Sequence, residues 1–351
     1  MSVKTLIVKH LLINHYFQVA IALFLCLIAF ANPLDARAAN LCPIGMVLIP
    51  GGNFTIGSDN SGYEEERSAT DVTVDRFCID RTEVTNAQFA KFVAATGYVT
   101  VAERPLSQTQ FPDLPDEQRS PGSLVFQMAK PDAKSVPALS WWHWTPGANW
   151  KHPFGSQSAI AGKENYPVVH IAYEDAVAYA KWAGKSLPTE AQWEFAARGG
   201  LDGTTYTWGD RYSAKKANTW QGIFPFFNTK TDGYIGTAPV ASFEPNGYGL
   251  YDMTGNVWEW TSDWFGVGHS SKVHQINPIG VAQKESFDPH KPGESALHVI
   301  KGGSYLCALN YCSRFRPAAR ESAAPDTGTT HIGFRLVTQV ASYEVKHFRS
   351  P

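Results

Sequence analysis

The sequence has few cysteines, little net charge and no long apolar segment beyond its N-terminal region. Its 351 residues include 5 cysteines, and 30 basic against 32 acidic side chains give a formal charge of −2 at pH 7. A balanced charge without a run of lysine or arginine offers no electrostatic footprint for nucleic acid or anionic lipid. The composition therefore sets both aside as partners.

Several catalytic signatures are also absent. The sequence contains no HExxH, no GxSxG, no GxxxxGK[ST], no GxGxxG after a strand and no EF-hand loop. It also lacks a His-x-x-x-His pair that could serve a non-haem iron oxygenase. His170, within the apolar run VVHIAY, is predicted to be a core residue, while His143 and His152 stay open between packing and ligation.

The first 40 residues have the composition of a secretory signal peptide. Lys4 and Lys9 precede an apolar run at 19–31 (VAIALFLCLIAFA), and Ala36-Arg37-Ala38 supplies a cleavage site of small residues. We predict a signal peptide over residues 1–38 and an exported protein with no membrane attachment after cleavage. An uncleaved anchor is the alternative, although a transmembrane helix needs about 20 apolar residues.

Export changes how the cysteines are interpreted. Removal of Cys26 with the signal peptide leaves four, and four cysteines in an oxidising compartment suggest two disulfides with three possible pairings. Cys42 and Cys78 each border a strand-like segment, and we predict a structural disulfide between them. Cys307 and Cys312 form the second pair, for which a disulfide, a metal site and a redox pair all remain open.

The stretch GGSYLCALNYC (302–312) contains this second pair. Cysteines five positions apart lie on opposite faces of a strand, so they can meet only if the segment turns. The preceding Gly302-Gly303 gives the backbone room to turn. Because convergence would permit a disulfide as well as a metal site, spacing alone does not choose between them.

Tryptophan (11), glycine (29) and proline (22) are the abundant features, and they predict aromatic side chains packed by loops with little regular structure. We predict strands at 46–50, 54–57 and 71–79, and helices at 85–96, 173–183 and 189–198. Residues 103–165, rich in proline and serine, predict a long surface excursion. Since no linker is visible, we expect one α+β domain over residues 42–340 and a tail at 341–351.

Several segments resemble one enzyme family. They are MVLIPGGNFTIGS (46–58), DRTEVTNAQFAKFV (80–93), YPVVHIAYEDAVAYAKWAGKSLPTEAQWEFAARGG (166–200), LYDMTGNVWEWTSDW (250–264), HVIKGGSYLCALNYCSRFRPAAR (298–320) and HIGFRLV (331–337). Together they are similar to the formylglycine-generating enzymes, the sulfatase-modifying family. The resemblance covers nearly all of the predicted mature chain. It implies a loop-rich α+β fold with sparse secondary structure, related to C-type lectin domains.

The resemblance also implies a copper-dependent oxidase. In active members of this family, the two cysteines of a GGSYxCxxxYCxRxR segment bind Cu(I), and this sequence has both Cys307 and Cys312. The expected reaction converts a cysteine in a Cys-x-Pro-x-Arg motif of an unfolded sulfatase polypeptide to Cα-formylglycine, with O₂ and a thiol reductant. Ser304 and Trp258 are implied as pocket residues that orient or stabilise O₂.

Two calcium sites are implied as well. The first would use Asn218 and Asp232 with the carbonyls of Thr219 and Tyr234, and the second would use Asp252 and Glu259 with the carbonyls of Gly255 and Val257. Sets of carboxylate, amide and carbonyl oxygens suit Ca²⁺. The alternative is that Asp232 and Asp252 are ordinary turn residues.

Relatives that share the fold without this activity supply a different hypothesis for the whole protein. The chain could be an exported, non-catalytic ligand-binding or assembly protein in which Cys307 and Cys312 form a structural disulfide. Copper binding by the cysteine pair separates the two hypotheses.

Overall fold

The computed structural model describes residues 42–109, 112–115, 119–130, 136–269, 274–293 and 296–340. Contacts divide the chain into residues 1–43 and 44–351, and the description concerns the second unit together with Cys42. The predicted signal peptide, Cys26 within it, and the predicted tail at 341–351 lie outside the described residues. Within the described ranges, no helix has the length and apolarity needed to cross a bilayer.

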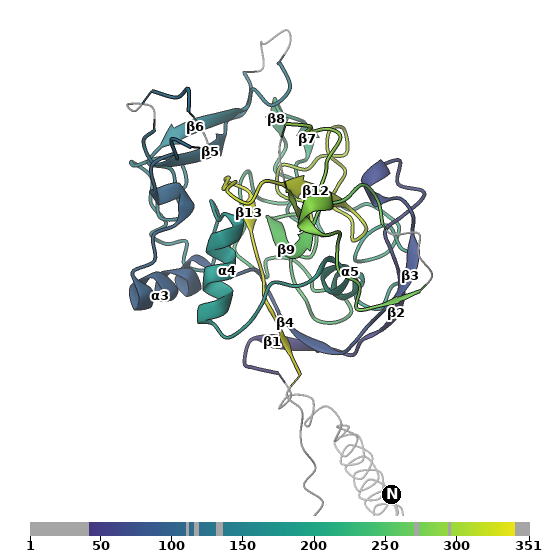
Figure 1. Cartoon of the computed structure of the whole chain (residues 1–351). Helices are drawn as coiled ribbons and strands as arrows, with labels where there is room; N and C mark the ends of the chain where they lie inside the picture. The colour runs from purple at the N-terminus through teal and green to yellow at the C-terminus, as the bar shows by residue number, and fades with distance from the viewer. Residues whose placement is uncertain are drawn as a thin grey trace, which may run out of the picture. The chain divides into compact units, whose positions relative to one another are not determined.

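The described chain is α+β, with short elements joined by long loops (Figure 1). The helices are α3 (Asn86–Thr96), α4 (Tyr173–Trp182) and α5 (Glu190–Arg198), with 3-10 turns η1 (Glu64–Glu66), η2 (Val101–Glu103) and η4 (Gln283–Glu285). The strands are β1 (Met46–Ile49), β2 (Gly52–Ile56), β3 (Thr70–Val74), β4 (Phe77–Asp80), β5 (Gly122–Phe126), β6 (Trp142–Pro146), β7 (Gly222–Ile223), β8 (Phe227–Asn228), β9 (Trp258–Trp264), β10 (Gln275–Ile276), β11 (His298–Lys301), β12 (Arg320–Ala323), β13 (Ile332–Gly333) and β14 (Val337–Gln339). The predicted fold class and sparse regular structure are confirmed.

The predicted helices form where local signals place them. Thr85 caps α3, where its hydroxyl accepts the backbone N–H of Gln88, and Gly97 ends the helix with a φ of 68°. Thr189 caps α5 in the same way, and Gly199 ends it with a φ of 59°. A side-chain acceptor at the start and a left-handed glycine at the end satisfy backbone groups that a helix leaves unpaired.

The single strand predicted at 71–79 is wrong, because the segment contributes to two sheets. β3 pairs with β2 and β10, whereas β4 pairs with β1 and β14. The chain changes sheets at Asp75-Arg76, directly against the β1–β2 turn, where a Cβ on Gly51 would lie 2.6 Å from the Arg76 nitrogen. Buried residues alternate along β3, whereas Phe77, Cys78 and Ile79 of β4 are all buried, so one alternating strand does not describe the segment.

The surface excursion predicted for residues 103–165 is only partly right: Leu139, Trp144 and Phe154 are exposed, but other described residues of the segment are buried, and part of it forms a regular element. β5 and β6 form an antiparallel hairpin, and Val125, Trp141 and Trp150 are at most 7% exposed. Burial of large aromatic side chains outweighs the polar composition of the surrounding loop. This segment contributes one wall of the candidate site.

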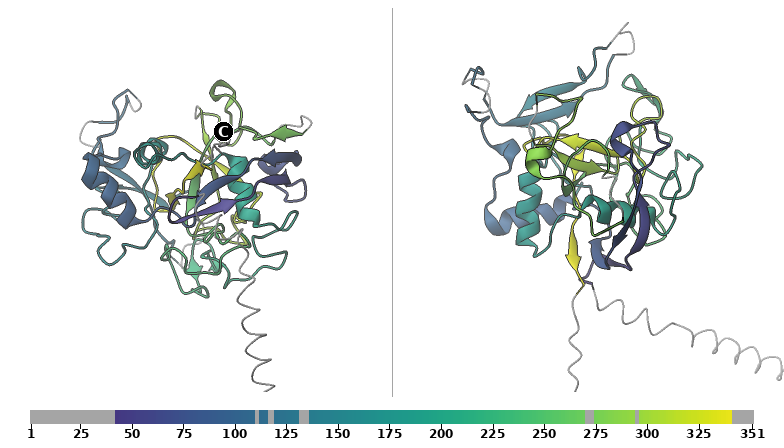
Figure 2. Two further views of the ribbon diagram at one scale, coloured as in Figure 1. Left: turned by 90° about the horizontal axis from the view of Figure 1, so that it is seen from below. Right: turned by 45° about the vertical axis from the view of Figure 1, so that its right-hand side comes forward.

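A four-stranded sheet, ordered β12-β11-β9-β13, occupies the middle of the described region (Figures 1 and 2). Along β9, Trp258 and Trp260 belong to the same buried cluster as Tyr179 of α4. Glu259, between them, accepts a hydrogen bond from Trp193 of α5. Successive side chains of a strand point to opposite faces, so β9 is buried on both of its faces. It places Trp258 at the edge of the cavity described below.

Cys42 and Cys78 are joined by a disulfide, as predicted, whereas Cys307 and Cys312 are free thiols. Cys78 lies in the middle of β4 and is fully buried. A covalent link between residues distant in sequence stabilises the fold chiefly by constraining the unfolded chain.

Candidate functional site

The segment from Ser304 to Cys312 turns on itself and brings the two free cysteines together. The backbone N–H of Cys307 donates to the Ser304 carbonyl and that of Cys312 to the Ala308 carbonyl, each at 2.9 Å. The two Sγ atoms are 3.0 Å apart. Gly303 permits the entry to the turn with a φ of 73°, since a Cβ there would lie 2.8 Å from the Phe315 Cα.

Both sulfurs line a cavity of about 210 Å³. Its apolar wall consists mainly of the aromatic rings of Trp141, Trp142, Phe224, Trp258 and Tyr311. Its polar lining comes from Ser304, Arg314, Glu321 and His331. The structure therefore brings the predicted pocket residues Ser304 and Trp258 into one cavity with both cysteines.

The two thiols have different proton affinities. Burial raises the pKa of Cys307. The hydrogen bond from the Cys307 thiol lowers the pKa of Cys312 against the opposing effect of burial, with smaller contributions from the backbone N–H and the charge of Arg314. One sulfur can therefore carry negative charge while the other donates to it. A thiolate is the form in which cysteine binds metals and acts as a nucleophile.

Arg314 is fixed beside the cysteines by the N-terminal part of the domain. It pairs with Glu65 of η1 at 2.6 Å and with Glu321 of β12 at 3.4 Å, and its guanidinium lies 4.3 Å from the centre of the Tyr63 ring. Two carboxylates and an aromatic face hold this cation in one orientation. Electrostatic support for Cys312 thus depends on residues about 250 positions earlier in the chain.

The first predicted calcium set is assembled around Asp232. Its carboxylate accepts the backbone N–H groups of Thr219 at 3.1 Å and Tyr234 at 3.0 Å, and the side chain of Gln221 at 2.9 Å. Asn218 donates through Nδ2 to Asn256 at 3.0 Å. Asp232 therefore contacts Thr219 and Tyr234 through their N–H groups and not through the predicted carbonyls, and Gln221 is a partner that the sequence did not indicate.

The second predicted set is arranged differently. Glu259 pairs through both oxygens with Arg335 at 2.7 Å and accepts the indole N–H of Trp193 at 2.8 Å. These three donors occupy the carboxylate, so Ca²⁺ there would compete with a buried guanidinium. Gly255 and Val257, also predicted ligands, lie on the buried segment between Asp252 and Glu259.

Glu83, which the sequence analysis missed, is the natural partner of Asp252. It is fully buried, its Oε2 has no hydrogen-bond partner among the described residues, and Asn256 donates to its Oε1 at 3.0 Å. Burial and the nearby Asp252 raise the pKa of Glu83, and burial raises the pKa of Asp252 to about 6. Glu83 and Asp252 are close enough to share a proton, and two buried carboxylates at that separation also fit a hard cation in its place. No local motif around DRTEV marks Glu83 as such a residue.

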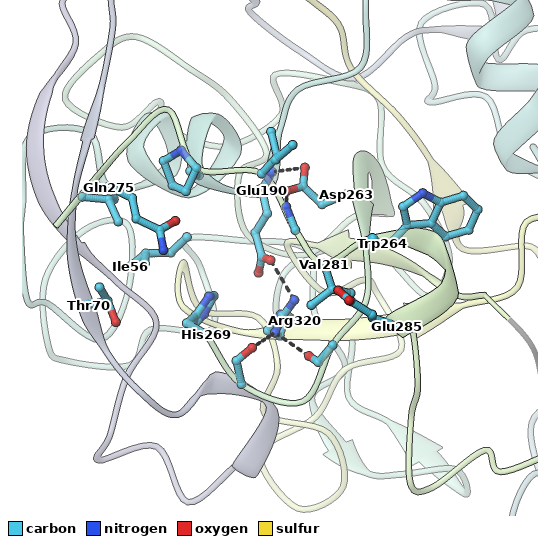
Figure 3. A pocket seen from close by; sticks show the side chains of 18 residues that line it. Ile56, Thr70, Glu190, Asp263, Trp264, His269, Gln275, Val281, Glu285 and Arg320 are labelled. Atoms are coloured by element: carbon cyan, nitrogen blue, oxygen red, sulfur yellow. Dashed lines mark hydrogen bonds and ion pairs between the residues drawn. The ribbon is translucent and has the colours of Figure 1, made fainter. Parts of the chain in front are cut away.

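A second, larger cavity of about 340 Å³ lies between β3, α5, β9 and β12 (Figure 3). Figure 3 shows Glu190 and Arg320 pointing toward one another, paired at 2.8 Å, with His269 beside them. Glu190, Glu194 and His269 are the group within the described ranges whose ligand atoms lie close enough to hold a metal.

Cations already fill the space between these carboxylates. Lys301 lies 2.9 Å from Glu194 and 3.4 Å from Glu190, and Arg198 lies 2.7 Å from Glu194. Although burial opposes ionisation, Lys301 and Arg198 lower the pKa of Glu194 to about 2. A divalent ion would have to displace a buried ammonium group, so we regard this cluster as an ion-pair network and not as a metal site.

Two histidines lie in different environments. His170 is fully buried, with Nδ1 2.8 Å from the Ser123 hydroxyl and Nε2 2.8 Å from the Pro153 carbonyl, so the predicted core role is confirmed. His331 was not singled out from the sequence, yet it lines the cysteine cavity. Its position as the first residue of the HIGFRLV segment (331–337) gave the only signal.

Comparison with known proteins identifies relatives over most of the chain. A family model described as Sulfatase-modifying factor enzyme 1-like domain matches residues 33–340. A "Formylglycine-generating enzyme" of Mycobacterium tuberculosis is 48% identical over 301 residues, which cover 85% of this chain and 98% of that protein. An "Inactive C-alpha-formylglycine-generating enzyme 2" of Mus musculus is 37% identical over 297 residues, or 84% of this chain and 85% of that protein.

Among solved structures, PvdO from Pseudomonas aeruginosa has a TM-score of 0.58 and 24% identity, over 84% of this chain and 94% of its own. This likeness supports the fold, not a shared activity. One of the two sequence relatives is named as an enzyme and the other as inactive. The residues of the cavity therefore bear on which of the two this chain resembles in function.

Proposed function

Because the chain belongs to the sulfatase-modifying factor family of formylglycine-generating enzymes, we propose that it oxidises a cysteine of a sulfatase polypeptide to Cα-formylglycine. The observation that carries the proposal is the pair of free thiols, 3.0 Å apart, in an aromatic cavity with Ser304 and Trp258. The expected target is a cysteine in a Cys-x-Pro-x-Arg motif of an unfolded chain.

The two cysteines suit Cu(I). Thiolates are soft donors that select Cu(I), whose low coordination number two sulfurs can satisfy, and Cys312 has the lowered pKa that favours a thiolate. Cys307 and Cys312 would hold the ion, which would supply one-electron chemistry with O₂. The protein's own contribution is ligation, orientation of the substrate cysteine and exclusion of water.

The surrounding side chains have roles that follow from their contacts. Trp258 and the other rings of the wall keep the cavity apolar. Ser304 is fully buried; its Oγ accepts the Leu306 N–H at 3.2 Å, which leaves its own proton free to donate. Arg314 favours the anionic form of Cys312. We assign Ser304 and Trp258 to orienting O₂ and the substrate thiol.

The overall reaction needs an external reductant. The substrate side chain CH₂SH, O₂ and two equivalents of a thiol would give the aldehyde, H₂S, H₂O and one disulfide, which balances atoms and electrons. Two hydrogens leave the substrate as its Cβ is oxidised to a thioaldehyde, and water then replaces sulfur. The cavity adjoins the surface through Tyr311, which is 47% exposed, so both substrate and reductant can reach it.

We also propose that the protein acts after export. The Cys42–Cys78 disulfide supports an oxidising compartment, in keeping with the signal peptide expected at 1–38. The substrate would then be met while it is still unfolded after crossing the membrane.

Incubation with a Cys-x-Pro-x-Arg peptide, Cu(I), a thiol and O₂ tests the proposed activity. Mass spectrometry should detect a product lighter by the mass of H₂S less that of one oxygen atom, with an aldehyde that reacts with hydroxylamine. A matched peptide with serine in place of cysteine should not change. If no aldehyde forms and the reduced protein binds no Cu(I), the non-catalytic alternative is favoured.

Calcium is proposed at both acidic sites, with Asp232 at the first and Asp252 with Glu83 at the second. Removing Ca²⁺ with a chelator should lower the melting temperature, because a native-state ligand at 100 times its Kd stabilises by about 2.7 kcal/mol. Thermal melts with and without Ca²⁺ measure this effect. Asp232→Asn and Glu83→Gln should each weaken the response, whereas Asp202→Asn, on an exposed turn, should not. Melting curves that ignore both chelator and Ca²⁺ would remove these sites.

A further inference from the structure

His331 has a defined place in the cysteine cavity but no role in the function proposed so far. It directly precedes β13, and its carbonyl accepts the backbone N–H of Trp258 at 2.8 Å. Its ring packs on Trp142 of β6 with 4.7 Å between the ring centres. The half-buried imidazole is thus held by two walls of the cavity that it lines.

The hydrogen bonds and the burial of Thr329 favour one position for the proton of this imidazole. Thr329 Oγ1 accepts the backbone N–H of His331 at 3.4 Å and lies 2.5 Å from the ring Nδ1. Thr329 is 4% exposed, so its hydroxyl proton needs an acceptor within the protein, and Nδ1 provides it. Nδ1 is then the acceptor, and the imidazole proton lies on Nε2.

A polypeptide substrate would bring unpaired backbone groups into this aromatic cavity. A buried carbonyl without a donor is costly, because it has lost its hydrogen bonds to water. Arg314 is already paired with Glu65 and Glu321, which limits what it can offer a carbonyl. His331 provides an N–H whose direction is fixed by Thr329 and Trp142.

We propose that His331 Nε2–H donates a hydrogen bond to a main-chain carbonyl of the substrate, next to the reacting cysteine. The inference rests on the proposed function and adds to it a residue that binds the main chain of the substrate. Thr329 acts through His331, as a positioning residue that selects the tautomer.

Binding of a serine-substituted peptide, Ser-x-Pro-x-Arg, tests this role without turnover. His331→Phe keeps a ring against Trp142 but has no donor, and it should weaken peptide binding about tenfold, the cost of one unsatisfied carbonyl. His331→Gln, whose amide can place an N–H near the Nε2 position, should recover affinity to within about threefold of the wild type. Thr329→Val removes the hydroxyl that selects the tautomer and should give an intermediate loss.

Fluorescence anisotropy gives the Kd values, and thermal melts and Cu(I) titration show whether fold and copper pair are intact. With the cysteine-containing peptide, His331→Phe should raise KM more than it lowers kcat. Wild-type affinity in His331→Phe, or equal loss in the Phe and Gln variants, overturns the hydrogen bond while leaving the proposed oxidase in place. A wild-type protein that neither binds nor oxidises the peptides overturns the proposed function and this inference with it.

Discussion

Replacing Cys312 with serine is expected to abolish formylglycine production while the fold survives. The change exchanges a soft thiolate, favoured here by Cys307 and Arg314, for a hard and largely protonated hydroxyl. Loss of a metal ligand should cost more than the roughly 10- to 100-fold that follows loss of a ligand's supporting partner. Peptide oxidation and Cu(I) titration on the purified variant measure both effects.

Cys42→Ser is the matched control, since it also removes one sulfur of a pair. It breaks the disulfide with Cys78 and should lower the free energy of unfolding by about 2–4 kcal/mol while activity per folded molecule is kept. If Cys312→Ser instead retained activity and lost stability as Cys42→Ser does, the second pair would be structural and the oxidase assignment would fail.

Arg335→Met is expected to cause a large loss of stability. Arg335 is fully buried and donates to both oxygens of Glu259 at 2.7 Å and to the Tyr251 carbonyl at 2.9 Å. Methionine fills similar space but leaves a buried carboxylate without its cation, which typically costs about 3–5 kcal/mol. Urea unfolding of wild type and variant, extrapolated to water, gives the difference.

Two further variants show whether charge is the cause. Adding Glu259→Gln to Arg335→Met should recover part of the loss, because the orphaned charge disappears. Glu244→Gln breaks the exposed pair with Lys216 and should leave the free energy of unfolding nearly unchanged, because solvent screens an exposed ion pair. A loss in Arg335→Met that matched that of Glu244→Gln would mean that the buried pair is not needed for the fold.

Local chemistry in the sequence determined the helices and the cysteine segment. Thr85 and Thr189 as caps, with Gly97 and Gly199 at the other ends, act within a few residues of where they stand, so the sequence alone locates α3 and α5. The pair Gly302-Gly303 similarly predicted the turn that brings Cys307 close to Cys312. Motif resemblance then supplied the family, which the comparisons support over residues 33–340.

Tertiary structure decided what depends on distant partners. The corner at Asp75-Arg76 forms because β3 and β4 pair within different sheets, and a strand's own polar pattern does not say which strands it will pair with. Residues 103–165 are polar on average, yet Trp141 and Trp150 are buried against segments far away in sequence.

The same holds for the candidate site. Arg335, 76 positions away in sequence, pairs with Glu259, so this carboxylate forms an ion pair in place of the calcium contact expected of it. Glu83 meets Asp252, and His331 meets Trp142, only when the chain is folded. A side chain's protonation, partners and access to a cavity depend on what surrounds it in three dimensions. The sequence therefore determined the residue types and the local turns, and the packing determined which of those residues act together.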